Sequence, residues 1–128
     1  MDGLQFSLLL LLISMIKQGN SYIDSVQNRG WLIGKFNPKA TIENENFEFK
    51  ISHHIKGDKR SIEDASSDPE RDTISILMSG KFKLIFPEDA REIILREETD
   101  YAHYSKNTQH AWECLEDCTM VTLRFITD

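Results

Sequence analysis

The 128-residue sequence contains only two cysteines, Cys114 and Cys118, and it has an acidic net charge of −6. Two cysteines cannot build a disulfide-stabilised framework, and their C-x3-C spacing lacks the further ligands that a zinc site needs. We expect both to be buried or edge thiols, with a disulfide between them as the alternative. The acidic balance and the scattered basic residues argue against nucleic acids and anionic membrane surfaces as partners, because both require a basic surface.

Several common catalytic motifs are also absent from the sequence. It contains no glycine-rich phosphate-binding loop, no G-x-S-x-G nucleophile motif and no H-E-x-x-H zinc motif. With 28% charged and 40% hydrophobic residues, the chain has the composition of one ordinary globular domain. These observations exclude several widespread enzyme classes and leave the strand pattern and the histidines as the main guides to function.

The longest apolar run, from Phe6 to Ile16, is interrupted only by serines and is too short to span a bilayer comfortably as a helix. Its length suits the hydrophobic part of a signal peptide, with Gly19 to Ser21 as a small-residue cleavage site, yet no Lys or Arg precedes it. Two alternatives are that residues 4–18 form a helix packed on the domain, or that Met15 is the true start.

We therefore divide the chain into an N-terminal apolar segment, residues 1–22, and one domain, residues 23–128. No membrane span is expected. We expect a cytoplasmic protein, with export as the alternative if residues 1–21 are a signal peptide.

From Gly30 onward, the chain consists of short segments with β patterns. In Phe47 to Ile55 the alternation places aromatic and aliphatic side chains on one face and Glu48, Lys50, Ser52 and His54 on the other. The polar residues 56–72 predict a long loop. The remaining predicted strands are 30–36, two within 73–86 that join at Ser79–Gly80, 92–97, 99–104, 110–117 and 119–126. So many short strands indicate an all-β sandwich or barrel.

Two segments resemble the paired sequence motifs of the cupins. ISILMSGKFKLIF, residues 74–86, is similar to the strand–glycine–strand that ends the first motif, with Gly80 at the turn. TDYAHYSKNTQHAWE, residues 99–113, is similar to the second motif, and His110 matches the motif histidine. Thr99, Ser105 and Asn107 replace the glycine, proline and second glycine of that motif.

The whole of Gly30 to Phe125 resembles small single-domain bacterial cupins of unassigned function, within the RmlC-like cupin superfamily. The matching features are Gly30–Trp31, the H-x-x-G-D-x-R pattern from His54 to Arg60, Gly80, His110–Ala–Trp112 and Arg124. This resemblance implies an all-β fold, a cupin-type antiparallel β-barrel or jelly roll, with a short N-terminal helix before it.

The resemblance also implies a metal site that this chain matches poorly. Metal-binding cupins use two histidines and a glutamate of the first motif and one histidine of the second, and such ligands suit non-haem iron. Thr73 stands where the glutamate is expected, and no histidine lies just before it. We therefore expect no metal cofactor. The alternative is a divalent zinc or iron ion held by His54, His103 and His110 in a metal-dependent oxygenase or isomerase.

A second group of side chains suits a small ligand. Arg124 shares a strand face with Thr122, and if that face lines the barrel lumen, its buried charge needs an anionic partner. Glu48, Glu113, or the carboxylate or phosphate of a ligand could be that partner. The predicted ligand-binding residues are His54, Arg60, Tyr101, His110, Trp112 and Arg124.

These patterns predict a soluble cupin-domain protein that binds a small ligand in the barrel lumen, with an anion as the candidate class. They favour a non-catalytic role over an enzymatic one. A third alternative is a structural module that forms a homodimer, because cupins often pair through strand edges.

Overall fold

The computed structural model describes residues 16–36 and 41–127. Helix α2 (Ser21–Ser25) begins after Asn20, whose side-chain oxygen accepts a hydrogen bond from the backbone N–H of Ile23 at 3.0 Å. A 3-10 turn (Val26–Asn28) then leads into the first strand. A short N-terminal helix is therefore present. Most of the alternative helix over residues 4–18, and the alternative start at Met15, lie outside the described residues.

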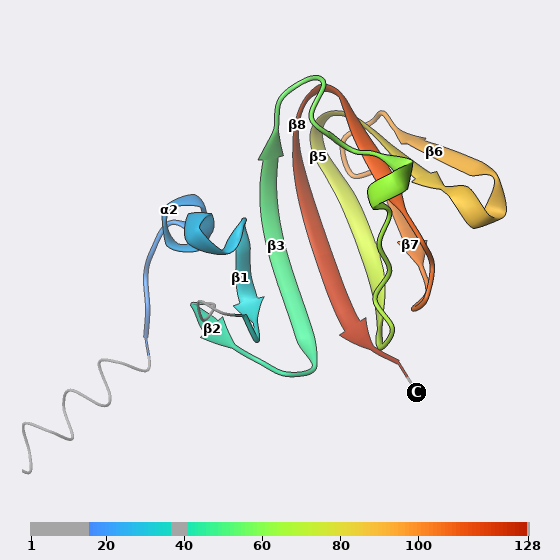
Figure 1. The fold of residues 1–128 in the computed structure, drawn as a ribbon. Helices are drawn as coiled ribbons and strands as arrows, with labels where there is room; N and C mark the ends of the chain where they lie inside the picture. The colour runs from blue at the N-terminus through green and yellow to red at the C-terminus, as the bar shows by residue number, and fades with distance from the viewer. Residues whose placement is uncertain (1–15, 37–40, 128) are drawn as a thin grey trace, which may run out of the picture.

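Eight strands form one hydrogen-bonded sheet that folds over on itself (Figure 1). All of its neighbouring strands are antiparallel except β1 and β2, which are parallel. In chain order the strands are β1 (Trp31–Gly34), β2 (Ile42–Glu43), β3 (Phe47–His54), β4 (Lys59–Arg60), β5 (Arg71–Phe86), β6 (Arg91–Leu95), β7 (Tyr101–Tyr104) and β8 (Ala111–Ile126). Two further 3-10 turns lie at Ile62–Asp64 and Pro87–Asp89.

The two longest strands, β5 and β8, have 16 residues each and hold the fold together. They pair along most of their length, and the register shifts midway, between Leu77 and Phe82. Before the shift, β5 pairs with β7 and with the half of β8 that also pairs with β3. After it, β5 pairs with β6 and with the half of β8 that pairs with β4.

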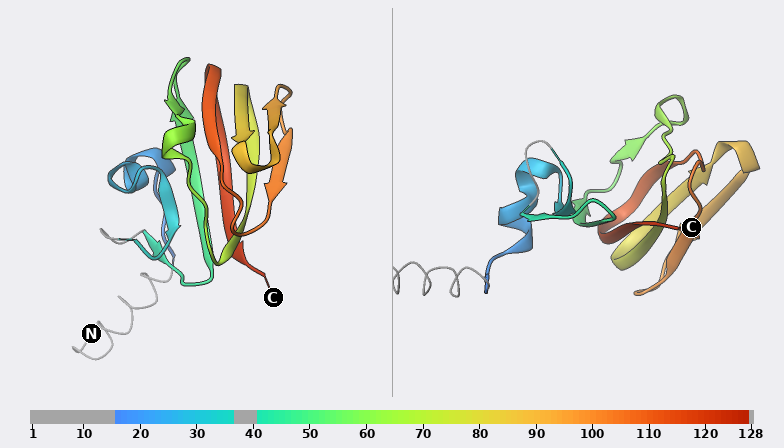
Figure 2. Two further views of the ribbon diagram at one scale, coloured as in Figure 1. Left: turned by 45° about the vertical axis from the view of Figure 1, so that its right-hand side comes forward. Right: turned by 90° about the horizontal axis from the view of Figure 1, so that it is seen from below.

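The halves on either side of this bend make two facing layers (Figures 1 and 2). The first layer contains β1, β2, β3, β7, the N-terminal half of β5 and the C-terminal half of β8. The second layer contains β4, β6 and the other halves of β5 and β8. A cluster of buried apolar residues that includes Leu77, Phe82, Leu84 and Met120 fills much of the space between them.

The prediction of two strands within 73–86, and of two more at 110–117 and 119–126, was wrong in one respect: each pair is a single continuous strand. The reason is that Gly80 does not reverse the chain. It lies at a φ of +88° in a bulge that bends β5 while pairing continues on both sides. The predicted loop 56–72 likewise contains β4 and a 3-10 turn.

Cys114 and Cys118 face each other at this bend, where β8 passes from one layer to the other. Both are buried and free, and their sulfur atoms lie 3.3 Å apart. Burial, reinforced by the neighbouring Cys114, raises the pKa of the Cys118 thiol to about 12. The prediction of buried thiols is therefore confirmed.

The two layers present different outer surfaces. On the second layer, ion pairs lie on the outside, between Lys81 and Glu116 at 3.4 Å and between Lys83 and Glu113 at 3.7 Å. On the first layer, alternation turns apolar, partly exposed side chains outward. We call this set the apolar outer face: Phe49, Ile51, Ile74, Ile76, Val121, Leu123 and Phe125. Within the described residues, no helix is long and apolar enough to cross a membrane.

Candidate functional site

A cavity lies between the two layers, with a narrow inner part of about 80 Å³ and a wider mouth of about 410 Å³. The inner part is lined from both layers, for example by Ser75 and Tyr104 of the first and by Phe82 and Leu84 of the second. The residues that line both parts are Lys50, Ser52, His54, Arg60, His110, Trp112 and Arg124.

Strand alternation explains how these residues come to face inward. On β3, Lys50, Ser52 and His54 lie two residues apart and therefore share the inner face. On β8, Thr122 and Arg124 share that face in the same way. The antiparallel register pairs Lys50 with Thr122, so the Lys50 and Arg124 side chains are diagonal neighbours on one surface.

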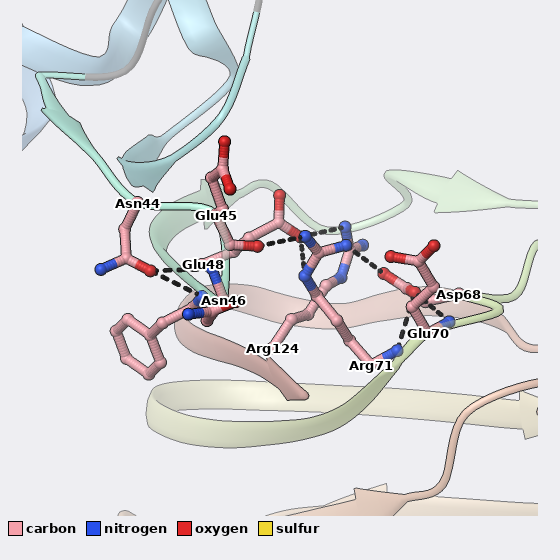
Figure 3. Close-up of polar contacts among 9 residues, drawn as sticks. Asn44, Glu45, Asn46, Glu48, Asp68, Glu70, Arg71 and Arg124 are labelled. Carbon is pink, nitrogen blue, oxygen red and sulfur yellow. Dashed lines mark hydrogen bonds and ion pairs between the residues drawn. The ribbon is translucent and has the colours of Figure 1, made fainter. Parts of the chain in front are cut away.

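Arg124 is held by a carboxylate that it shares with a second arginine (Figure 3). Its Nη1 lies 3.6 Å from Oε1 of Glu48, which is 6% exposed. The same oxygen lies 3.8 Å from Nε of Arg71. Arg71 also approaches Asp68 at 3.7 Å and donates a hydrogen bond to the backbone carbonyl of Glu45 at 2.8 Å. Glu48 therefore balances only part of the positive charge that Arg124 brings to the cavity.

Trp31, which is 3% exposed, holds two cations at the cavity mouth. The Arg124 guanidinium carbon lies 4.4 Å from the centroid of its ring, and Nζ of Lys50 lies 4.8 Å from it. The same ring stacks on Phe36 at 5.1 Å. Such cation–π contacts favour a fixed position for both charges without neutralising them.

Lys50 and Arg60 lack an ionic partner: among the residues that the structure describes, no carboxylate oxygen lies within 4.0 Å of either charged group. Arg60 donates a hydrogen bond to the hydroxyl of Ser66 at 2.5 Å. The pKa of Lys50 is lowered to about 8. Burial is the largest cause, the charges of Arg124, Arg60 and Arg29 act in the same direction, and Glu48 opposes them with a smaller effect. The cavity is thus strongly cationic in an acidic protein.

The two inner histidines are biased towards their neutral forms. Burial is the main cause that lowers the pKa of His54, and Lys50 adds to it, while Asp58 opposes it from 3.8 Å. Burial also lowers the pKa of His110, together with the charges of Arg60, Arg124 and Lys50, against a hydrogen bond with the Thr108 carbonyl. Both rings can therefore donate and accept hydrogen bonds at neutral pH.

Tyr104 adds a hydroxyl to the same surface. Burial raises its pKa, and the hydroxyl lies 3.4 Å from that of Ser75. Its ring packs against His110 with centroids 4.8 Å apart. On the opposite wall, Trp112 packs against His54 at 4.6 Å and against Phe82 at 5.4 Å.

Five of the six residues predicted to bind a ligand line this cavity, and Tyr101 does not. Tyr101 is 66% exposed, because alternation along β7 turns Tyr101 and His103 outward and Ala102 and Tyr104 inward. The tyrosine that lines the cavity is Tyr104. The prediction also omitted Lys50, although Lys50, Ser52 and His54 follow one another at intervals of two residues and therefore share one strand face.

The alternative metal site of three histidines is not assembled. His103 lies on the outer side, half exposed, with Nε2 3.1 Å from Asp72, whereas His54 and His110 line the cavity. Within residues 16–36 and 41–127, no three His, Cys, Asp or Glu side chains group closely enough to hold a metal ion. Glu113, an alternative partner for Arg124, pairs with Lys83 instead.

No protein-family model matches the sequence, and no curated protein matches it either. Solved structures do match the fold. A cupin superfamily protein from Desulfitobacterium hafniense superimposes with a TM-score of 0.57 at 17% identity, over 66% of this chain and 71% of that one. An RmlC-like cupin from Desulfovibrio desulfuricans gives 0.54 at 14% identity, over 65% and 74%. The chain has the cupin fold.

A conserved protein of unknown function from Streptococcus pyogenes is also similar, with a TM-score of 0.57 at 15% identity over 68% of this chain and 70% of that one. At such identities the shared property is the fold alone. The expected all-β cupin-type jelly roll with one short helix is confirmed. The chemistry of this cupin-fold chain must be argued from its own cavity residues.

Proposed function

We propose that this cupin-fold protein binds a small organic anion in the cavity between its two layers. One observation carries the proposal: Lys50, Arg60 and Arg124 line the same cavity in a chain of net charge −6. Among the described residues, Glu48 is the one carboxylate that forms an ion pair with any of the three. The excess positive charge would be balanced by an anionic ligand.

The types of side chain favour a carboxylate or phosphate group as the part of the ligand that is recognised. A guanidinium presents parallel N–H donors that match either group, and such charge-assisted hydrogen bonds are stronger than neutral ones. The neutral imidazoles of His54 and His110 and the Tyr104 hydroxyl offer further polar contacts. Because the inner part measures only about 80 Å³, it suits a small anionic group, with the rest of the ligand in the mouth.

Titration calorimetry at low salt with acetate, lactate, citrate and inorganic phosphate tests the proposal. We expect at least one of these anions to bind, and Arg124→Gln and Arg60→Gln to weaken its binding by about tenfold to a hundredfold. Glu48→Gln should strengthen binding, because it removes the carboxylate that competes for Arg124.

Lys83→Gln is the matched control, since it removes one positive charge from the outer surface, where Lys83 pairs with Glu113. It should leave affinity nearly unchanged. If none of the four anions binds, or if Lys83→Gln weakens binding as much as Arg124→Gln, the cavity is not an anion site.

We infer a second, compatible role from the apolar outer face of the first layer, namely pairing with another copy of this chain. The second layer has charged pairs on its outside, as is usual for a solvated surface, whereas the first layer has partly exposed aliphatic and aromatic side chains. An exposed, contiguous apolar surface commonly marks an interaction site. The seven side chains of this face carry no charge, and the Asp72–His103 pair lies at its edge, so two acidic chains could meet there with little local repulsion.

A further inference from the structure

Lys50 stands out in the cavity because its amine is kept inside without a counter-charge. A lysine near a surface normally extends its amine to water. Here the aliphatic part of Lys50 packs so closely against Gly30 that a Cβ atom added to the glycine would lie 3.2 Å from Cγ of Lys50. The Lys50 amine nitrogen lies 4.8 Å from the centroid of the Trp31 ring. The side chain lines both the inner cavity and its mouth. The amine is therefore presented to whatever occupies the cavity.

The surroundings also favour an amine that reacts as a nucleophile. An amine attacks a carbonyl carbon only when it is unprotonated, and a lysine is activated by burial or by neighbouring cations. Lys50 has both, since it loses hydration on burial and shares the cavity with Arg124 and Arg60. Among the described residues, no carboxylate forms an ion pair with its nitrogen. A lysine that served only as a structural charge would be expected to have an acidic partner.

We propose that Lys50 forms a reversible imine with the carbonyl carbon of a small 2-oxo acid bound in the cavity. This inference rests on the proposed function, because the carboxylate would be held by Arg124 and Arg60 as in simple anion binding. In a 2-oxo acid the ketone is directly attached to the carboxylate. Fixing the carboxylate on the guanidinium groups would therefore bring the carbonyl carbon to the Lys50 amine.

The reaction needs no oxidant or reductant. The lone pair of the Lys50 nitrogen forms a C–N bond while the carbonyl oxygen takes up a proton, and the nitrogen loses one, which gives a carbinolamine. The oxygen then leaves as water when the C=N double bond forms. Amine and ketone thus give imine and water. Tyr104 and His110 line the same cavity and supply groups that can donate and accept these protons.

Borohydride trapping tests this step on the full chain. Sodium borohydride reduces an imine to a stable secondary amine, so pyruvate followed by borohydride should raise the protein mass by one pyruvic acid less one oxygen atom. Peptide mass spectrometry should place the adduct on Lys50, at more than tenfold the level on the exposed Lys59 of the same molecules. Lys50→Arg should abolish it. Borohydride without pyruvate, or lactate with borohydride, should give no adduct.

Lactate separates failure of this inference from failure of anion binding, since it has a carboxylate and a hydroxyl in place of the ketone. If lactate binds in the calorimeter but pyruvate with borohydride leaves Lys50 unlabelled, the imine is wrong and anion binding stands. If pyruvate neither binds nor labels Lys50, and none of the four anions in the calorimeter binds either, both are wrong. Labelling spread equally over Lys50 and Lys59 would also overturn the imine. That comparison within one protein holds even if Lys50→Arg folds poorly.

Discussion

At the scale of single residues, the cavity gathers charges that oppose folding. Lys50 loses hydration on burial and faces the cations Arg124, Arg60 and Arg29, with only Glu48 acting in the opposite direction. Its pKa falls from the ordinary 10.5 to about 8. Residues at functional sites often lower the stability of the fold. A destabilising residue that lines a cavity is therefore a candidate for ligand binding.

This shift predicts a specific pH dependence. Between about pH 8 and 10.5 the unfolded chain holds a proton on Lys50 that the folded chain has lost, so the free energy of unfolding rises with pH across that window. Below pH 8 the full penalty remains, on the order of 3 kcal/mol. Urea unfolding of the wild type and of Lys50→Met at pH 7.5 and pH 10 measures this destabilisation by Lys50.

Lys50→Met should be the more stable protein at pH 7.5, and its advantage should shrink towards pH 10. Subtracting the free energy of unfolding of one protein from that of the other cancels the contributions of the other groups that titrate in this range. A difference that stays constant with pH would show that Lys50 keeps its ordinary pKa. His54 and His110, whose pKa values are also lowered, act in a separate window, where stability falls as the pH drops below about 6.5.

The strand face that a side chain occupies could be predicted only where apolar and polar residues alternate clearly. The alternation in residues 47–55 is strong, so the shared face of Lys50, Ser52 and His54 followed directly. The segment 99–104 has apolar and polar residues on both faces, and its phase was ambiguous. That ambiguity is why Tyr101 was predicted at the site instead of Tyr104.

At the scale of elements, the bend in β5 decides the architecture. A Cβ atom added to Gly80 would lie 2.2 Å from the backbone oxygen of Asp117 and 2.7 Å from Cα of Cys118. A glycine is required here for two reasons: its φ is +88°, and β8 passes too close to leave room for a side chain. Both long strands can therefore turn from one layer into the other at the same level.

Gly80→Ala should lower the free energy of unfolding by about 3–5 kcal/mol, because the left-handed conformation and the backbone clash act together. Gly57→Ala is the matched control. Gly57 has a similar φ of +96°, yet nothing lies within 4 Å of its added Cβ, so the loss should be about 1–2 kcal/mol. Urea unfolding at one pH compares the two variants. Equal losses would mean that the close approach of β8 contributes nothing.

Element boundaries were the least predictable feature, for a related reason. A glycine and polar residues between two apolar segments look the same in sequence whether the chain reverses or merely bends. The distinction depends on the partner strand, and β8 continues past the bend beside β5. The short pair formed by β4 with β8 arises in the same way, since Lys59 and Arg60 have no strand pattern of their own.

At the scale of the whole molecule, the two layers differ in what they show to solvent. The apolar outer face covers three adjacent strands, which at ordinary strand spacing amounts to on the order of 300 Å². Tyr22 and Val26 of the N-terminal helix and turn are exposed and line one pocket with Ile51, so they extend this apolar surface. A standard stable interface needs about 800 Å² per partner, so this surface should support a weak homodimer.

We therefore expect a dimer whose population rises with protein concentration. Sedimentation equilibrium over a wide concentration range should show this for the wild type, and Leu123→Lys should remove it by placing a charge at the centre of the face. Ile62→Lys is the control, because Ile62 is 56% exposed and lies outside that face. A wild type that stays monomeric throughout, or a Leu123→Lys variant that still dimerises, would contradict the pairing.

The sequence by itself determined the all-β class and the faces of the most regular strands, because these depend on local alternation and turn chemistry. The acidic balance follows from composition alone. The resemblance of its histidine and glycine segments to cupin motifs pointed to the correct fold. Only the tertiary structure decided that Lys50, Arg60 and Arg124 share one cavity with Glu48 as their partial counter-charge. These residues lie on three strands, and their convergence depends on register and on the bend at Gly80, which no local pattern specifies.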